Sequence, residues 1–252
     1  MVIQVEAALQ ATGNKTMQIE KQLQDLVSKA KTALDARLSS ILLYGSAARN
    51  EFDSGHSDLN ILILTNDLNP ATLKAAAPLL IWWVEQRNPQ PLLFTLDEFR
   101  RSCDAFPIEI TDIKASHRIL FGESPLEGLT VDRTHHRAQL EHEIRSKLLR
   151  LRQKAMPVLG DNKALLRLME DSVTTFLLFI RHALLLKQLE APAARRSLVE
   201  AAHRAGLIDP LPFAQLIDLR EGKLSPKSVD SVQLFEDYLK QIQSLVASVD
   251  AL

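Results

Sequence analysis

The sequence predicts an α+β domain, with a small mixed sheet and flanking helices, followed by an all-α helical bundle. Short apolar runs alternate with helical patterns in the first half, whereas after Gly128 only helical patterns remain. The hydrophobic period changes near residue 125, so we expect two domains, residues 1–126 and 127–252. A length of 252 residues also favours two modest domains over a single core.

Short apolar runs rich in Ile or Leu and bounded by turn residues predict the strands of the first domain. These runs are Ser39–Tyr44, Asn60–Thr65, Pro91–Thr95 and Pro107–Ile113. Three further segments fit helices: Met17–Leu38, Pro70–Gln86 and Leu96–Ala105. Alternation of this kind is typical of a layered structure in which helices cover a sheet.

In the second half, apolar residues recur at spacings of three and four, which predicts helices. The predicted helices are Arg133–Met156, Asn162–Leu189, Arg195–Ala205 and Val229–Val249. The second of them is apolar nearly all round, so we expect it at the centre of the bundle. Three histidines on the first helix, His135, His136 and His142, lack the spacing of a metal-binding pair and are expected on a solvated face.

The composition excludes several classes of protein. Thirty Lys and Arg against 31 Asp and Glu leave a formal net charge of −1, without the surplus of cations that a protein coating a nucleic acid needs, although this leaves room for a local basic patch. Cys103 is the only cysteine, which excludes an intrachain disulfide and a multi-cysteine zinc site. The longest apolar stretch, Ala75–Val84, is about half a membrane span and contains Pro78. We therefore expect a soluble, cytoplasmic protein with no membrane partner.

The segment that carries chemistry is Leu42–Leu64, LLYGSAARNEFDSGHSDLNILIL. A predicted strand runs into Gly45 and Ser46, where a glycine lets the backbone turn tightly and the following N–H groups can face an anion. Asp58 and Asn60 are two residues apart at the start of the next strand, so their side chains are expected on one face. Two oxygen-bearing side chains beside a phosphate-binding turn can hold Mg²⁺ against a nucleotide.

This pattern of Gly-Ser, a spacer and Ser-Asp-x-Asn resembles the nucleotidyltransferase superfamily that includes DNA polymerase β and the aminoglycoside nucleotidyltransferases. A helical C-terminal domain is also typical of its two-domain antibiotic-modifying members. The resemblance implies that Gly45 and Ser46 hold a nucleoside triphosphate and that Asp58 binds the metal.

The resemblance also implies a third carboxylate from a later strand. Glu109 is the best match and Asp112 the second, and on a regular strand only one of them can face Asp58. Arg49 and Ser57 are further candidates for the phosphates of the nucleotide.

The sequence departs from the family pattern at Asn60, which stands in place of the second metal-binding Asp. An amide oxygen can still coordinate Mg²⁺, but the site loses one negative charge. Phosphoryl transfer depends on metal positioning and on charge neutralisation. We therefore expect this change to weaken metal binding or to abolish turnover.

Three functions remain open at this point. The first is transfer of a nucleoside monophosphate to a hydroxyl of an unidentified small molecule or protein, with Mg²⁺ held by Asp58, Asn60 and Glu109. The alternative is a catalytically degenerate nucleotide-binding or regulatory module. The third rests on Arg196 and His203, whose spacing resembles the RNase motif of HEPN domains and would place a site in the helical half, across a homodimer.

Overall fold

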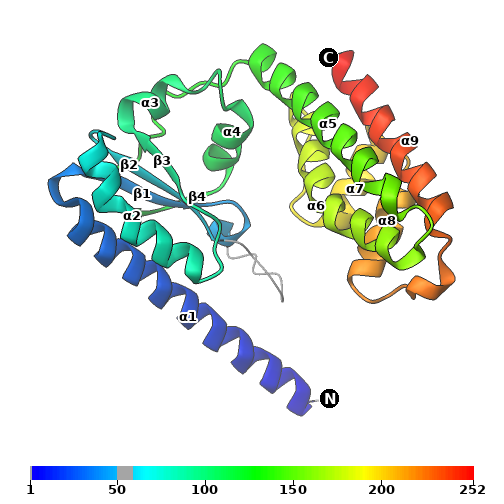
Figure 1. Ribbon diagram of the computed structural model, residues 1–252, viewed down its shortest axis with the longest axis horizontal. Helices are drawn as coiled ribbons and strands as arrows, with labels where there is room; N and C mark the ends of the chain where they lie inside the picture. Colours follow the sequence, from blue (N-terminus) through cyan, green and yellow to red (C-terminus); the bar gives the residue numbers. More distant parts are fainter. Residues whose placement is uncertain (1, 50–58) are drawn as a thin grey trace. The chain divides into compact units, whose positions relative to one another are not determined.

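The computed structural model describes residues 2–49 and 59–252 and divides the chain into two compact units. The first unit comprises Met1–Cys103 and Glu109–Thr130, and the second comprises Asp104–Ile108 and Val131–Leu252. The first contains a sheet with flanking helices, and the second is helical (Figure 1). The predicted fold class, an α+β unit and a helical bundle, is confirmed.

The sheet of the first unit has four strands in the order β3-β2-β1-β4. The strands are β1 (Leu38–Tyr44), β2 (Asn60–Thr65), β3 (Leu92–Thr95) and β4 (His117–Phe121). β1 runs antiparallel to both β2 and β4, whereas β3 is parallel to β2, so the sheet is mixed as expected. In the register of β1 and β2, Tyr44 is opposite Asn60.

Helices cover both sides of this sheet (Figure 1). They are α1 (Val2–Leu34), α2 (Pro70–Glu85), α3 (Leu96–Arg101) and α4 (Pro107–Ala115), together with the 3₁₀ turns η1 (Asp35–Arg37) and η2 (Ser46–Arg49). Ile41, Leu43 and Ile61 lie in one hydrophobic core with the buried residues of α1 and α2, including Trp83. Because side chains alternate along a strand, Tyr44 is on the opposite face of β1 from these residues.

The segment Pro107–Ile113 is not a strand, and this prediction is wrong: it forms most of α4. A proline at the first position of a helix is favourable, since its missing N–H would have no partner within the helix. Ile110 and Ile113, three residues apart, are both buried, which is the spacing of a helix face. A short apolar run cannot separate a strand from a buried helix by periodicity alone.

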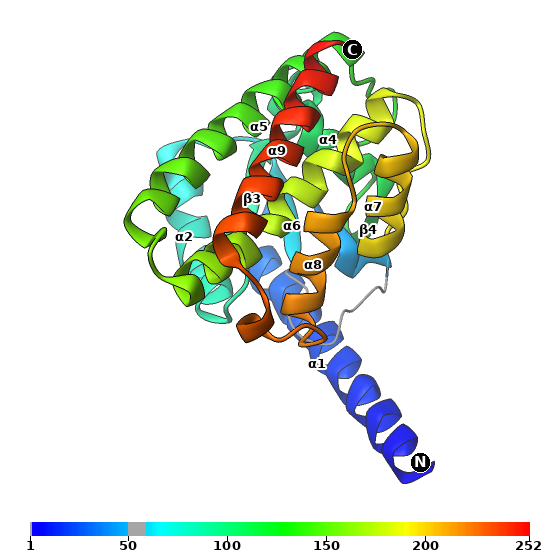
Figure 2. The same ribbon diagram turned by 90° about the vertical axis from the view of Figure 1, so that its right-hand side faces the viewer.

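The second unit contains five α-helices, with 3₁₀ turns at η3 (Met156–Val158) and η4 (Pro226–Ser228) (Figure 2). The helices are α5 (Arg133–Ala155), α6 (Asn162–Leu186), α7 (Arg195–Arg204), α8 (Leu211–Arg220) and α9 (Ser231–Asp250). α6 contacts each of the other four, so its predicted central position is confirmed. One helix of this unit, α8, was not predicted from the sequence; it is short and has Pro212 in its first turn.

The expectation for the histidines of α5 is correct at two positions and wrong at the third. His135 and His142 are exposed. His136 is buried instead, and its Nε2 lies 2.9 Å from Nδ1 of His182 on α6. The pair joins two helices inside the bundle. None of the described helices is long and apolar enough to cross a membrane.

Candidate functional site

The site begins at Gly45, where β1 ends and the chain turns into η2. Gly45 has a φ of 83°, a left-handed conformation that glycine adopts without steric penalty. Its N–H donates to the carbonyl oxygen of Ser116 over 3.0 Å, and the Ser116 hydroxyl donates back to the Gly45 carbonyl oxygen, also over 3.0 Å. The N–H of Ala48 donates to the same carbonyl. Hydrogen bonds from two separate segments therefore hold the predicted phosphate-binding turn.

Asn60 lies directly beside this turn. A Cβ placed on Gly45 would be 3.3 Å from Nδ2 of Asn60. Asn60 is the first residue of β2, and its antiparallel partner is Tyr44, the last residue of β1. Opposite residues of an antiparallel pair project to the same face of the sheet, so Asn60 and Tyr44 share a face. Gly45 and Asn60, which were predicted to belong to one site, are thus close together in the structure.

The two acids of α4 lie near the same end of β1. Burial, followed by the negative charges of Glu109 and Asp112, raises the pKa of Tyr44 to about 12. Glu109 and Asp112 are three residues apart on a helix, so they project from the same side of it. The expectation that Asp112 would point away from Glu109 depended on a strand and is wrong. Both carboxylates are half-buried and act on one phenol.

The remaining predicted site residues are Ser46, Arg49, Ser57 and Asp58. Ser57 and Asp58 lie outside the described residues. Ser46 and Arg49 are the first and last residues of η2, and the structure describes their backbone there. The prediction that Asp58 and Asn60 share a face stays a prediction.

The donors that the site offers are all oxygen atoms of carboxylates or an amide, which is the donor set that Mg²⁺ prefers. Glu109 and Asp112 supply the carboxylates and Asn60 the amide. Within residues 2–49 and 59–252, no group of three or more His, Cys, Asp or Glu side chains is arranged to hold a metal ion. The chemical types of these side chains thus suit Mg²⁺.

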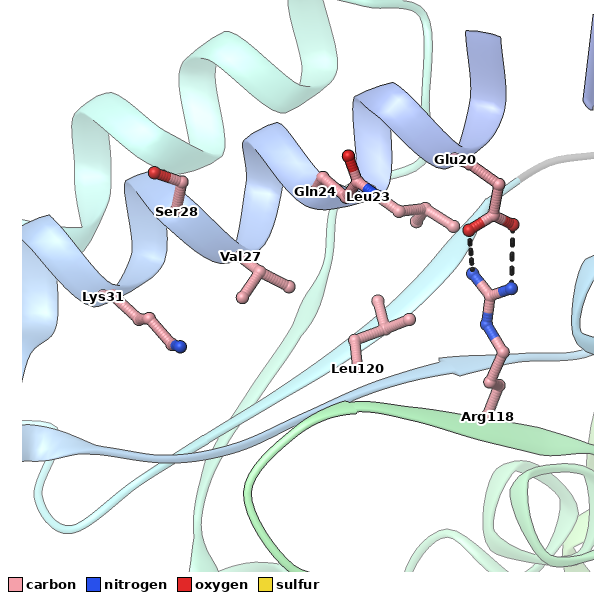
Figure 3. A pocket seen from close by; sticks show the side chains of 8 residues that line it. All are labelled: Glu20, Leu23, Gln24, Val27, Ser28, Lys31, Arg118 and Leu120. Carbon is pink, nitrogen blue, oxygen red and sulfur yellow. Dashed lines mark hydrogen bonds and ion pairs between the residues drawn. The ribbon is translucent and has the colours of Figure 1, made fainter. Parts of the chain in front are cut away.

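A separate hollow of about 340 Å³ lies between α1 and β4 (Figure 3). At one end Arg118 donates two hydrogen bonds to the carboxylate of Glu20, over 2.8 and 3.2 Å. Its other lining residues are Leu23, Gln24, Val27, Ser28, Lys31 and Leu120. No predicted nucleotide or metal residue lines it, so the hollow does not bear on the site at Gly45.

Arg196 and His203, the candidate RNase pair, each contact other residues of the helical unit. The guanidinium of Arg196 donates to Asp218 over 2.6 Å and to Glu221 over 2.7 Å. Nδ1 of His203 lies 3.3 Å from the carbonyl oxygen of Ile208. Arg196 thus ties α7 to the end of α8, which is a structural role.

Two residues of the site were missed by the sequence analysis. Tyr44 was taken only as the last residue of a buried strand, although its place directly before the Gly-Ser turn was a usable signal. Ser116 lies in a different segment of the sequence from Gly45, and nothing local marks it as a partner. Its position directly before β4, the neighbour of β1, brings the two together.

Comparisons with known proteins identify the fold. No protein-family model matches the sequence, and no curated protein matches it either. Among solved structures, spectinomycin adenyltransferase AAD(9) from Enterococcus faecialis, crystallised with ATP and spectinomycin, is similar, with a TM-score of 0.56 and 11% sequence identity. The similarity covers 91% of this chain and 99% of that chain, so it includes the sheet-containing unit and the helical unit. The chain has a nucleotidyltransferase-like fold, as its motif indicates.

Proposed function

We propose that this protein binds a nucleoside triphosphate at the end of β1 and β2 and transfers its nucleoside monophosphate to a hydroxyl of a small molecule or protein. One observation carries the proposal. The Gly45 turn, Asn60 and the two acids of α4 gather around Tyr44 at one end of the sheet. The solved neighbour of the same fold holds ATP together with spectinomycin, which is a small molecule.

In the proposed reaction an acceptor hydroxyl attacks the α-phosphorus of the nucleotide. A new oxygen–phosphorus bond forms, the hydroxyl loses its proton to solvent, the bond to the bridging oxygen of the β-phosphate breaks, and pyrophosphate leaves. Backbone N–H groups that follow Gly45, including that of Ser46, would bind the phosphates, and Arg49 and Ser57 are further candidate phosphate ligands. Asp58, Asn60 and Glu109 would hold Mg²⁺, which when bound supplies positive charge against the triphosphate.

Calorimetry of ATP binding, with and without Mg²⁺, tests the nucleotide site. We expect wild-type protein to bind ATP more tightly with Mg²⁺, and Asp58→Ala to lose most of this gain. Asp25→Ala, which removes an exposed carboxylate from α1, serves as the matched control and should bind like the wild type. Pyrophosphate release in an acceptor screen then tests transfer. If neither the wild type nor Asn60→Asp transfers to any acceptor, the proposed reaction is wrong.

A second candidate is a nucleotide-binding or regulatory module without catalysis. It is favoured by Asn60, whose neutral amide stands where the family pattern has an Asp. This module would bind ATP equally well with and without Mg²⁺, and Asp58→Ala would change the affinity little. A strong dependence of ATP affinity on Mg²⁺ would exclude it.

A further inference from the structure

The helix α2 is apolar on nearly every side. Of its 16 residues, PATLKAAAPLLIWWVE, only Lys74 and Glu85 are charged. Its inner face is buried, with Ala76, Leu79 and Trp83 in the core that also contains residues of α1 and the sheet. A helix that is apolar all round is ordinarily covered on all sides, so we expect the outer face of α2 to be covered as well.

The outer face of α2 carries an apolar stripe, which consists of Leu73, Ala77, Ile81 and Val84. These residues are four, four and three positions apart, so their side chains project from one face of the helix. Leu73, Ile81 and Val84 are 47%, 58% and 46% exposed. Single exposed apolar side chains are common on protein surfaces, whereas a row of them along one helix face indicates an interaction surface.

The two charged residues of α2 border this apolar stripe on the same edge. Lys74 and Glu85 are eleven positions apart, which is about three helical turns, so they lie on one line along the helix. Both are exposed, and within residues 2–49 and 59–252 neither of them forms an ion pair. The midpoint between Lys74 and Glu85 falls within one residue of the midpoint of the apolar stripe.

This placement of charge makes the face of α2 complementary to itself. A two-fold axis at the shared midpoint, perpendicular to the helix, would set a second α2 antiparallel to the first and would keep each edge of the stripe on its own side. Lys74 of each copy would then be opposite Glu85 of the other, while the two apolar stripes pack together between the charged pairs. A parallel arrangement would instead put like charges side by side.

We propose that the apolar stripe of α2 is an interface between two copies of this chain, in which α2 packs antiparallel against α2. The stripe runs along a single helix that is about 24 Å long, so its area is well below the roughly 800 Å² per partner of a standard interface. The dimer is therefore weak, and its population depends on the concentration of the protein.

Sedimentation velocity of the full chain tests the interface. We expect the wild type to pass from monomer to dimer between about 1 and about 300 µM, a range that suits a weak association. Ile81→Glu puts a charge in the middle of the apolar stripe and should keep the protein monomeric throughout this range. Val84→Lys is a second variant of the stripe with the same expected result. Leu211→Glu changes a 61% exposed leucine of α8 and, as the matched control, should dimerise like the wild type.

An exchange of charges tests the antiparallel pairing. Lys74→Glu would put two acids opposite each other at both ends of the interface, so the dimer should dissociate about three- to tenfold more readily, and Glu85→Lys should act alike. The double variant Lys74→Glu with Glu85→Lys restores opposite charges and should return the affinity to within about twofold of the wild type. Lys240→Glu, which reverses an exposed charge on α9, should leave the affinity unchanged.

Three results would each overturn the proposal. The first is a wild type that stays monomeric at the highest concentration. The second is a dimer that persists in Ile81→Glu and Val84→Lys, with the fold of both variants verified by circular dichroism. The third is a double charge variant that dimerises no better than Lys74→Glu. None of the proposed nucleotide or metal residues lies on α2, so the monomeric variants should bind ATP like the wild type whether or not transfer is observed.

Discussion

At Gly45 the backbone conformation and the nearest side chain impose separate costs on any substitution. Gly45→Ala puts a Cβ on a residue with φ of 83°, 3.3 Å from the Asn60 amide. We expect a loss of about 1–2 kcal/mol in the free energy of unfolding, measured by urea denaturation. ATP affinity should fall as well, because the turn and Asn60 shift together.

Gly128 provides the matched control for that variant. It has a φ of 73°, but a Cβ there would meet no atom within 4 Å. Gly128→Ala should therefore show the strain of the backbone alone and leave ATP affinity unchanged. Equal effects of the two substitutions on ATP binding would contradict the assignment of the turn at Gly45 to the nucleotide site.

The two tyrosines of the chain, Tyr44 and Tyr238, are both expected to ionise above the usual pH of about 10. Burial raises the pKa of Tyr238, and burial with the charges of Glu109 and Asp112 raises that of Tyr44 to about 12. Each phenol thus keeps its proton to a higher pH in the folded protein than in the unfolded chain. The free energy of unfolding therefore falls as pH rises from about 10 to about 12.

Absorbance at the wavelength of tyrosinate follows this titration. Glu109→Gln removes one negative charge near the Tyr44 phenol, so it should lower the pKa of Tyr44. Glu127→Gln, which changes an exposed acid of the same unit, should leave the pKa of Tyr44 unchanged. A Tyr44 titration that is identical in the wild type and in Glu109→Gln would contradict the proximity of α4 to the end of β1.

The residues of the site differ in how far the sequence could reveal them. Gly45 and Asn60 could be identified, because a glycine after a strand and a polar residue at the start of the next are local signals. The partnership of Tyr44 with Glu109 and Asp112 could not, since it depends on the packing of a helix more than 60 positions away in the sequence. Asp58 was identified from its motif, and its place in space stays a prediction.

Among the elements, α4 and β4 could not be predicted from the sequence. Pro107–Ile113 has the length and the isoleucines of a strand, yet it forms a helix. The strand that pairs with β1 on the side away from β2 is β4, whose residues are half-buried or exposed, with Ile119 42% exposed. Such an edge strand lacks the continuous apolar run by which buried strands are predicted.

The link between α7 and α8 should make the stability of the helical unit depend on pH. Hydrogen bonds from Lys223 and Arg196 lower the pKa of Glu221 to about 2, from an ordinary value of 4.5. A carboxyl with a lowered pKa in the folded state stabilises the fold above pH 4.5, and this contribution is lost as pH falls toward 2.

Glu221→Gln should therefore reduce the free energy of unfolding by about 0.5–1 kcal/mol at neutral pH, a small effect because water screens an ion pair at the surface. The difference from the wild type should shrink between pH 4.5 and about 2, as measured by urea denaturation at a series of pH values. The exposed Glu200 of α7 supplies the control, and Glu200→Gln should show no such trend. If the difference in free energy of unfolding between Glu221→Gln and the wild type does not depend on pH, the stabilisation by Glu221 is not ionic.

At the scale of the whole molecule, each unit has a hydrophobic core of its own. Ile242 on α9 is fully buried in the helical core, and Ile63 on β2 is fully buried in the core of the sheet. Ile242→Ala should cost about 2–5 kcal/mol and speed amide hydrogen exchange in α5, α6 and α9. Ile63→Ala should speed exchange in β1 and β2 instead. Uniform acceleration across the chain in either variant would contradict separate cores.

The division into units could be predicted only in outline. A change of hydrophobic period shows where helices replace strands, because both patterns are local. It cannot show that Asp104–Ile108 groups with the second unit while Glu109–Thr130 returns to the first. That division depends on contacts between segments far apart in the sequence.

The two tryptophans of the chain, Trp82 and Trp83, are neighbours on α2. Trp83 is fully buried, and Lys29 Nζ lies 5.0 Å from the centre of the Trp82 ring. Intrinsic tryptophan fluorescence is therefore a signal from the sheet-containing unit alone, without any added label. Far-ultraviolet circular dichroism, in contrast, reports the helices of both units. Recording both during one denaturation therefore distinguishes the melting of the sheet-containing unit from that of the whole chain in a single unmodified sample.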